Sequence, residues 1–233
     1  RAINQKIEDL PSLLDPGDLL IFNDTKVIPA RLVAKKKASG GKVEIFVETI
    51  HSDSSALVRL KASKSPKVGG VLVSDGGEEL IVREQIGEFF LVEVCSKRTF
   101  RDLLDSSGQV PLPPYIDRSE EPIDKHRYQT IFADVEGAVA APTAGFHFDE
   151  PLFRALDKKG VERQFITLHI GSGTYQPVRN LLKEHRMHSE RYRVSEPVCF
   201  AIEEAKKRGS KVIAVGTTVA RALEAATVRD GGV

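Results

Sequence analysis

The chain has 233 residues and a net charge of +1, and 41% of its residues are hydrophobic and 29% charged. This composition is ordinary for a globular protein and excludes a mostly disordered chain. The near-neutral charge argues against strong nonspecific attraction to nucleic acid, so any such binding must come from local patches. No apolar run approaches the roughly 20 residues of a membrane helix. No signal segment opens the chain, so we expect a cytoplasmic protein without membrane attachment.

The first apolar run, Leu19 to Phe22, has the length of a buried strand and ends at the polar tail Asn23-Asp24-Thr25. From about residue 29 to residue 100 the sequence then alternates between apolar and polar positions, as in Val43 to Thr49 and Ala56 to Leu60. Glycine-rich turns separate these runs. The pattern is typical of half-buried antiparallel strands and predicts a small β-barrel of about five or six strands.

A proline-rich connector, Pro111 to Ile116, follows this β-rich region. Beyond it the pattern alternates between strands and helices. The expected elements are a strand at 139–141, a helix at 151–159, a strand at 164–170, a helix at 197–208, a strand at 211–215 and a helix at 218–226. We therefore predict an α/β domain formed by residues 1–28 and 115–233, interrupted by an inserted β-barrel domain at 29–114.

Three apolar runs in the expected α/β domain end in small polar residues. Asn23-Asp24-Thr25 follows the first, Gly171-Ser172-Gly173-Thr174 follows the run ending at Ile170, and Gly216-Thr217-Thr218 follows the run ending at Val215. In α/β sheets, ligands bind outside the carboxyl ends of parallel strands. We expect these three tails to meet at one ligand site.

Four of the six histidines, His147, His169, His185 and His188, lie in the α/β segment beside polar or glycine-rich turns. Histidine exchanges protons near neutral pH, so this group suits general acid or base catalysis. Each histidine could instead anchor a loop by hydrogen bonding.

A metal site is an alternative use of the same side chains. His169, His185 and His188 could bind a metal ion, although the neighbouring Arg186 and Arg191 would repel a cation. The two cysteines, Cys95 and Cys199, are too few for a disulfide framework or a four-thiolate zinc site, and we expect both to be buried. We predict no metal.

Two further segments could contact a small polar ligand. Gly216-Thr217-Thr218 precedes an expected helix, whose N-terminal N–H groups favour a carboxylate or phosphate, although Thr218 could simply be the N-cap. The loop from Ala141 to Phe148 could hold a flat heterocycle between Phe146 and Phe148, unless these rings belong to the core. Neither segment matches a nucleotide-binding fingerprint for ATP or NAD.

Motifs distributed along nearly the whole chain resemble the S-adenosylmethionine:tRNA ribosyltransferase-isomerase family. They are Phe22 to Leu32, Pro111 to Ile116, Arg127 to Thr130, Gly137 to Gly145, Thr167-Leu168-His169 with Gly173-Thr174, Glu184 to Glu190, and Val215 to Thr218. The family has Ser-Val where this chain has Val219-Ala220, and commonly Leu in place of Phe146. It also extends beyond both ends of this chain, so we expect terminal segments to be missing here.

The resemblance implies an enzyme of queuosine biosynthesis. It would transfer the ribosyl moiety of S-adenosylmethionine, its co-substrate, to 7-aminomethyl-7-deazaguanine at the tRNA wobble position. Isomerisation would give epoxyqueuosine in tRNA, with release of adenine and methionine. The implied fold is an α/β barrel-like domain with an inserted small antiparallel β-barrel, and we expect a monomer.

These expectations assign three groups of site residues. The catalytic candidates are His169, His185, His188 and Asp24. The candidates for S-adenosylmethionine binding are Asn23, Thr25, Pro142, Thr143, Gly145, His147, Gly171, Gly173, Thr174, Gly216, Thr217 and Thr218. The candidates for tRNA contact are Arg31, Lys35, Lys36, Arg179 and Arg186. A metal-dependent hydrolase and a non-catalytic RNA-binding module are the competing functions.

Overall fold

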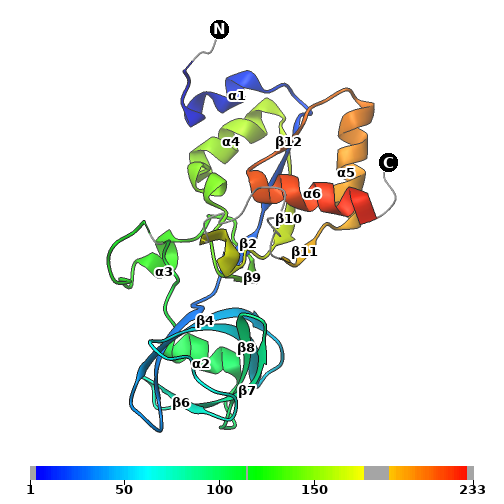
Figure 1. Cartoon of the computed structure of the whole chain (residues 1–233). Coiled ribbons are helices and arrows are strands. Elements are labelled where there is room, and N and C mark those ends of the chain that lie inside the picture. The colour runs from blue at the N-terminus through cyan, green and yellow to red at the C-terminus, as the bar shows by residue number, and fades with distance from the viewer. Residues whose placement is uncertain (1–3, 114, 176–188, 230–233) are drawn as a thin grey trace. The chain divides into compact units, whose positions relative to one another are not determined.

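The computed structural model describes residues 4–113, 115–175 and 189–229 (Figure 1). The chain divides into two compact units. One comprises Arg1–Lys26, Gln129–Ile170 and Ser189–Val233, and the other comprises Val27–Tyr128 and Gly171–His188. We call them the α/β unit and the barrel unit. The predicted domain boundaries instead group the segments 27–28, 115–128 and 171–188 with the α/β part, and these boundaries stay a prediction.

Six antiparallel strands close the barrel in the order β3-β4-β5-β8-β7-β6, which confirms the predicted small β-barrel. The strands are β3 (Arg31–Lys36), β4 (Lys42–Ile50), β5 (Ser55–Lys61), β6 (Val71–Ser74), β7 (Glu79–Ile86) and β8 (Phe89–Val94). Alternate residues are buried because successive side chains of a strand point to opposite faces, as in β8, where Phe90, Val92 and Val94 are buried.

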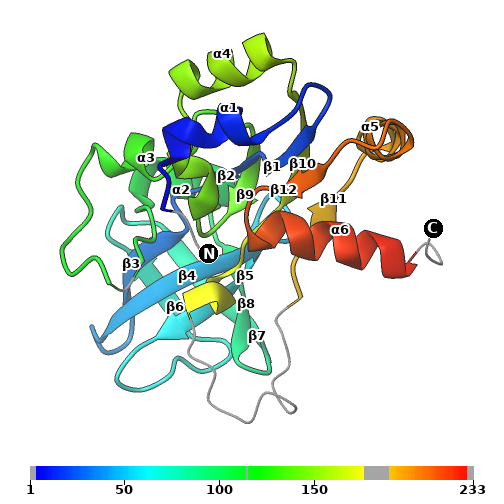
Figure 2. The ribbon, with the colours of Figure 1, turned by 90° about the horizontal axis from the view of Figure 1, so that it is seen from above.

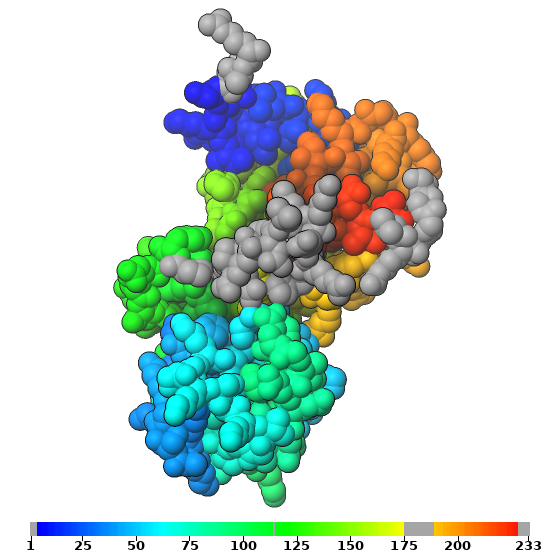
Figure 3. Space-filling view, in the orientation of Figure 1, coloured from blue at the N-terminus to red at the C-terminus, as the bar shows by residue number. Residues whose placement is uncertain are grey.

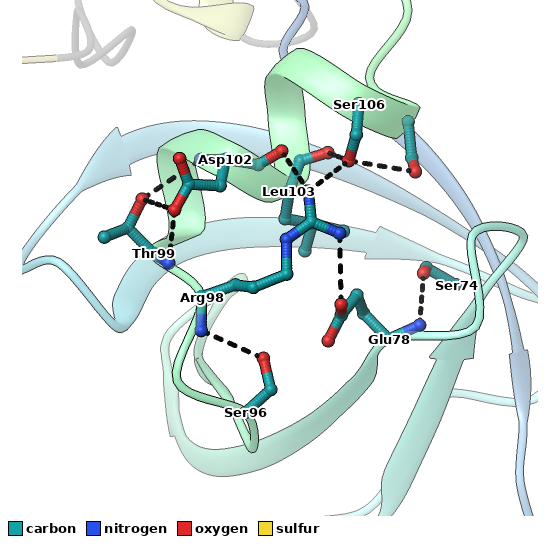
Figure 4. Close-up of polar contacts among 9 residues, drawn as sticks. Ser74, Glu78, Ser96, Arg98, Thr99, Asp102, Leu103 and Ser106 are labelled. Atoms are coloured by element: carbon teal, nitrogen blue, oxygen red, sulfur yellow. Dashed lines mark hydrogen bonds and ion pairs between the residues drawn. The ribbon is translucent and has the colours of Figure 1, made fainter.

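Helix α2 (Phe100–Ser107) packs against the barrel and buries Phe100, Leu103 and Leu104. A capping box begins the helix: the Thr99 hydroxyl accepts from the Asp102 N–H at 3.1 Å, and the Asp102 carboxylate accepts from the Thr99 N–H at 2.9 Å. Arg98 lies between the helix and the strands (Figure 4) and donates to Glu78 at 3.2 Å and to the Asp102 carbonyl at 3.2 Å. These contacts fix the start of α2 on the barrel.

The α/β unit contains a mixed sheet with the strand order β11-β10-β1-β12. Its strands are β1 (Leu19–Asn23), β10 (Glu162–Leu168), β11 (Tyr192–Arg193) and β12 (Val212–Ala214). Strands β10, β1 and β12 are parallel, and β11 pairs with β10 in the antiparallel direction. Among the described residues this sheet is open, and the barrel-like closure that the resemblance implies stays a prediction.

Helices cover both faces of this sheet (Figure 2). On one face, Leu20 and Phe22 pack against α4 (Glu150–Lys159). On the other lie α5 (Glu196–Lys207) and α6 (Thr217–Arg229), which contact β1 and β10. The remaining elements are η1 (Ile7–Asp9), α1 (Leu10–Leu13), β2 (Thr25–Val27), α3 (Asp124–Arg127), β9 (Val135–Ala138), η2 (Thr143–His147) and η3 (Ser172–Tyr175).

Two sequence-based expectations about these elements are wrong. Val139 to Ala141 is not a strand: the strand β9 ends at Ala138 and pairs with β2, and the small apolar residues that follow are buried without strand geometry. Cys95 and Cys199 are exposed, not buried. Cys95 follows the end of β8, and Cys199 lies beside the exposed Phe200 on α5, which forms an outer surface in Figure 3.

Within the described residues, no helix combines the length and the apolar character that crossing a membrane requires.

Candidate active site

The carboxyl ends of β10, β1 and β12 lie side by side at one edge of the sheet. Asn23, the last residue of β1, pairs with Ile166 of β10, and the Val215 N–H just after β12 donates to the Ile21 carbonyl at 2.9 Å. These contacts place the carboxyl ends of the three strands at one edge, whereas the meeting of all three polar tails at one ligand site stays a prediction. The turn from Gly171 to Thr174 belongs to the barrel unit, so only the tails after β1 and β12 and the residues up to Ile170 are described at this edge.

Asn23 extends the pairing between β1 and β10 with its side chain. Its Oδ1 accepts from the Leu168 N–H at 2.9 Å, and its Nδ2 donates to the Leu168 carbonyl at 3.0 Å. The same Oδ1 also accepts from the Thr25 N–H at 3.3 Å, which turns the chain from β1 into β2. Asn23 is buried, and its amide holds the end of β1 against β10 through these hydrogen bonds.

Thr25 and Gly137 surround the imidazole of His169. The Thr25 Oγ1 lies 2.8 Å from Nδ1 of His169, and Thr25 is fully buried. Gly137, on β9, has φ of +148°, and a Cβ there would lie 2.8 Å from Cε1 of the imidazole. Only glycine has both the conformation and the space that this arrangement needs.

Asp24 is the second titratable group at this edge. The Thr167 hydroxyl donates to its Oδ1 at 2.7 Å. Partial burial raises the pKa of Asp24, with a further contribution from Asp134, while the hydrogen bond from Thr167 and the charge of Arg193 act in the opposite direction. A carboxylate with a raised pKa is a better proton acceptor than an ordinary surface carboxylate.

His169 is shifted towards its neutral form. Partial burial lowers its pKa, and the nearby positive charge of Arg191 lowers it further. The edge therefore holds an imidazole that favours its neutral form and a carboxylate, each just after the end of one of two adjacent strands. This pair can supply a hydrogen-bond donor or acceptor together with a negative charge.

The loop at η2 lies beside the start of α6. A Cβ on Gly216, whose φ is +92°, would lie 2.9 Å from the Cβ of Ala144, and one on Gly145 would lie 2.7 Å from Cγ2 of Thr130. Pro142 and Gly145 are buried, and Thr143 and His147 are exposed. The absence of a side chain on Gly216 thus allows the tail after β12 to approach Ala144 of η2 closely.

The two alternatives for these segments have different outcomes. Phe148 belongs to the core, as its alternative predicted: it is buried in an aromatic cluster, with its ring centroid 4.8 Å from that of Phe22, and does not clamp a heterocycle against the exposed Phe146. The prediction that Thr218 is the N-cap is wrong. Helix α6 begins at Thr217, and the Ala220 N–H donates to the Gly216 carbonyl at 3.3 Å. Gly216 therefore occupies the N-cap position, and Thr218 lies within the first turn.

The remaining described candidates lie in the barrel unit. Gly171 packs against the Glu48 carboxylate, which accepts from the Ser172 N–H at 3.2 Å. Gly173 and Thr174 are in η3. Among the tRNA candidates, Arg31 pairs with Glu44 at 3.4 Å, whereas Lys35 is exposed and its neighbour Lys36 donates to the Lys64 carbonyl.

Some predicted residues cannot be placed. His185, His188, Arg179 and Arg186 lie outside the described residues. The described residues contain no group of three or more His, Cys, Asp or Glu side chains that could hold a metal ion. Because two of the three histidines in the metal alternative lie outside them, that alternative stays untested.

Sequence reasoning missed several residues that the structure places at the sheet edge. Gly137 and Thr167 entered the sequence analysis only as parts of motifs, and Arg193 was not assigned to the site. Thr167 could have been found from its position one strand along from Asp24. No local signal could have found Gly137, because its contact with His169 joins segments that are 32 residues apart (169 minus 137).

The fold combines a small β-barrel with an α/β unit in which three parallel strands end at one edge. The family model described as "Queuosine biosynthesis protein" matches residues 1–231, so the chain belongs to this family, and the resemblance seen in the sequence is confirmed.

Curated relatives carry a more specific name. Proteins named S-adenosylmethionine:tRNA ribosyltransferase-isomerase from Xylella fastidiosa strains M12 and M23 are each 51% identical over 221 residues. The match covers 94% of this chain and 63% of each relative, so the chain spans less than two thirds of their length. A solved S-adenosylmethionine tRNA ribosyltransferase from Thermotoga maritima matches with a TM-score of 0.33 and 23% identity, over 91% of this chain and 56% of that one.

Proposed function

We propose that this chain carries out ribosyl transfer and isomerisation from S-adenosylmethionine to 7-aminomethyl-7-deazaguanine at the tRNA wobble position. The products would be epoxyqueuosine in tRNA, adenine and methionine, formed in the cytoplasm where tRNA is modified. Family membership over residues 1–231 and the names of the relatives support the proposal. The observation that carries it is the pairing of His169 with Thr25 beside Asp24, at the carboxyl edge of the parallel strands.

The charges at this edge suit S-adenosylmethionine. Its sulfonium is a cation, and the Asp24 carboxylate supplies a negative charge that ordinary water does not fully screen, because the group is half-buried. Its methionine carboxylate is an anion and suits the start of α6, where the N–H groups of the first turn point outwards. The edge thus offers complementary charges for both ends of the methionine part.

The proposed chemistry needs two proton transfers. The sulfonium acidifies the carbon next to it, so a base removes a proton there, and a donor assists the departure of adenine. Asp24 and His169 are two titratable groups that follow adjacent strands at this edge, and we assign these two transfers to them. Burial raises the pKa of Asp24 towards neutral pH, and it lowers the pKa of His169, which favours a neutral imidazole.

The tRNA contact is proposed for the barrel unit. Lys35 lies opposite Lys42 on paired strands β3 and β4, so two positive side chains stand near one end of the barrel. Lysines attract phosphates without reading sequence, which suits a substrate that is identified by its modified base. Arg31 is a weaker candidate because Glu44 already pairs with its guanidinium.

The direct test is release of adenine. The chain is incubated with S-adenosylmethionine and tRNA that carries the deazaguanine base, and free adenine is measured by chromatography. Unmodified tRNA is the matched control, and a full-length Xylella fastidiosa relative is the reference. Adenine release that requires the modified tRNA supports the proposal, and its absence under conditions where the relative is active refutes it for this chain.

A further inference from the structure

We infer that the Thr25 hydroxyl donates its hydrogen to Nδ1 of His169, so that neutral His169 carries its own proton on Nε2. His169 then presents an N–H donor at the sheet edge, and Thr25 is the residue that positions it. This inference rests on the proposed function for its role in the reaction, but not for the tautomer itself. In this state His169 donates a hydrogen bond to an acceptor atom of the substrate, and it does not act as the base that removes a proton from a C–H bond.

The buried hydroxyl of Thr25 needs an acceptor for its hydrogen. Thr25 is fully buried, and within the described residues its Oγ1 has one hydrogen-bond partner, Nδ1 of His169 at 2.8 Å. If Nδ1–H were the donor, the hydroxyl hydrogen would be buried without an acceptor, at a cost of about 1–3 kcal/mol. If the hydroxyl is the donor, only oxygen lone pairs stay unused, which is commonly tolerated.

The second step concerns the orientation of the ring. The His169 backbone N–H donates to the Arg191 carbonyl at 2.9 Å, so the main chain is held by the segment next to β11. The Gly137 backbone then closes off one side of the imidazole, where a Cβ would lie 2.9 Å from Nδ1 and 3.1 Å from Nε2. A ring flip would exchange Nδ1 for carbon at Thr25 and leave the buried hydroxyl without its partner.

The third step concerns the protonation state. Burial and Arg191 lower the pKa of His169, so the imidazole is neutral near pH 7 and holds one proton. With Nδ1 accepting from Thr25, that proton is on Nε2, and Nε2 has no partner among the described residues. A fixed N–H donor of this kind fits a ring nitrogen of a heterocyclic base, such as the departing adenine.

This assignment separates the two proton-transfer roles. A neutral imidazole with Nε2–H cannot accept a proton at Nε2, and its Nδ1 is already engaged by Thr25. The proton next to the sulfonium must therefore go to another group. We assign it to Asp24, a carboxylate with a raised pKa that the Thr167 hydroxyl orients through the hydrogen bond to Oδ1.

Nitrogen NMR of the chain labelled with ¹⁵N-histidine tests the tautomer without any substrate. The His169 signals are assigned by their loss in His169→Gln, and the spectrum is recorded at mildly alkaline pH. We expect Nδ1 of His169 to have the shift of an unprotonated nitrogen and Nε2 that of a protonated one. The reverse pattern, or averaged shifts for both nitrogens, would overturn the inference.

Two substitutions then test Thr25 as a positioning residue. Thr25→Val keeps the shape and removes the hydroxyl, so the tautomer preference should be lost and kcat for adenine release should fall about 10-fold, with KM little changed. Thr25→Ser keeps the hydroxyl and should restore both readouts. A Val variant that keeps the wild-type tautomer and kcat would contradict the role. Adenine release by the wild-type chain separately tests the proposed function, so the two failures are distinguishable.

Discussion

The barrel and the carboxyl edge of the α/β sheet differ in which residues they bury and in how far apart in sequence the bonded residues lie. In β8 every second residue is buried and apolar, and the side chains that cap α2 bond to neighbours within a few residues. At the sheet edge the buried residues include Asn23 and Thr25, which are polar and bond to residues 145 and 144 positions away. The barrel therefore depends on the alternation of apolar and polar residues within each strand, whereas the sheet edge depends on contacts between segments that are distant in sequence.

The difference agrees with the proposal that the ligand binds at the sheet edge. Buried polar groups cost free energy unless each one is paired, so a fold keeps them where they serve positioning or chemistry. Asn23 fixes the end of β1 and Thr25 fixes an imidazole, whereas the barrel interior is almost entirely apolar. Substitutions in the two regions should therefore have different consequences, and four predictions test this.

The largest effect on stability is expected from Asn23→Asp. The change removes the donor to the Leu168 carbonyl and places a carboxylate in a site that is 2% exposed. We expect the free energy of unfolding to fall by about 3 kcal/mol, measured by urea denaturation. Ser74→Ala in the barrel, which removes the acceptor for the Glu78 N–H, is the comparison and should cost about 1 kcal/mol. Equal losses would contradict the special role of Asn23.

Gly137→Ala should lower kcat for adenine release. The new Cβ would push the imidazole of His169 aside, and a displacement of about 1 Å can lower kcat about 100-fold, equivalent to about 2.7 kcal/mol of barrier. The measurement is kcat for adenine release. Gly77→Ala in the barrel is the matched control, because Gly77 also has positive φ (+85°) but nothing lies within 4 Å of its Cβ position. A Gly137→Ala variant as active as Gly77→Ala would refute the contact.

Thr99→Ala tests a local contact of the barrel unit, the N-cap of α2. Loss of the N-cap should cost about 1 kcal/mol of stability and leave adenine release unchanged. The backbone N–H of Thr99, and next its hydroxyl, lower the pKa of Asp102. Because the folded pKa is below the unfolded one, this stabilisation is present above the unfolded pKa of about 3.9 and is lost as pH falls through the folded value. Urea denaturation across acidic pH should show a weaker pH dependence in Thr99→Ala.

The smallest effect is a shift in the titration of His169. Its midpoint, followed by NMR, should lie below the ordinary histidine value of about 6.5 because burial and Arg191 disfavour the charged form. Arg191→Gln should move the midpoint upwards while the backbone bond to His169 stays in place. The associated stability is present above the unfolded pKa and is lost as pH falls below it. A midpoint that does not move would exclude Arg191 as a cause.

The sequence predicted the barrel well because its strands alternate with period two, a property that each strand carries by itself. The convergence of the strand ends also followed from local patterns, since buried parallel strands end at one edge. Phe148, Thr218 and Gly137 could not be assigned in this way. Whether a ring belongs to the core, where a helix begins and which glycine faces a histidine depend on segments that are distant in sequence.

The central claim is that the sheet edge of the α/β unit, and not the barrel, binds S-adenosylmethionine. Titrating the chain with S-adenosylmethionine while following the histidine ring signals by NMR tests it directly, with His169 at the edge and the exposed His51 in the barrel unit as internal control. We predict a saturable shift of the His169 signals and none for His51. An unchanged His169, or a saturable shift confined to His51, would contradict the claim.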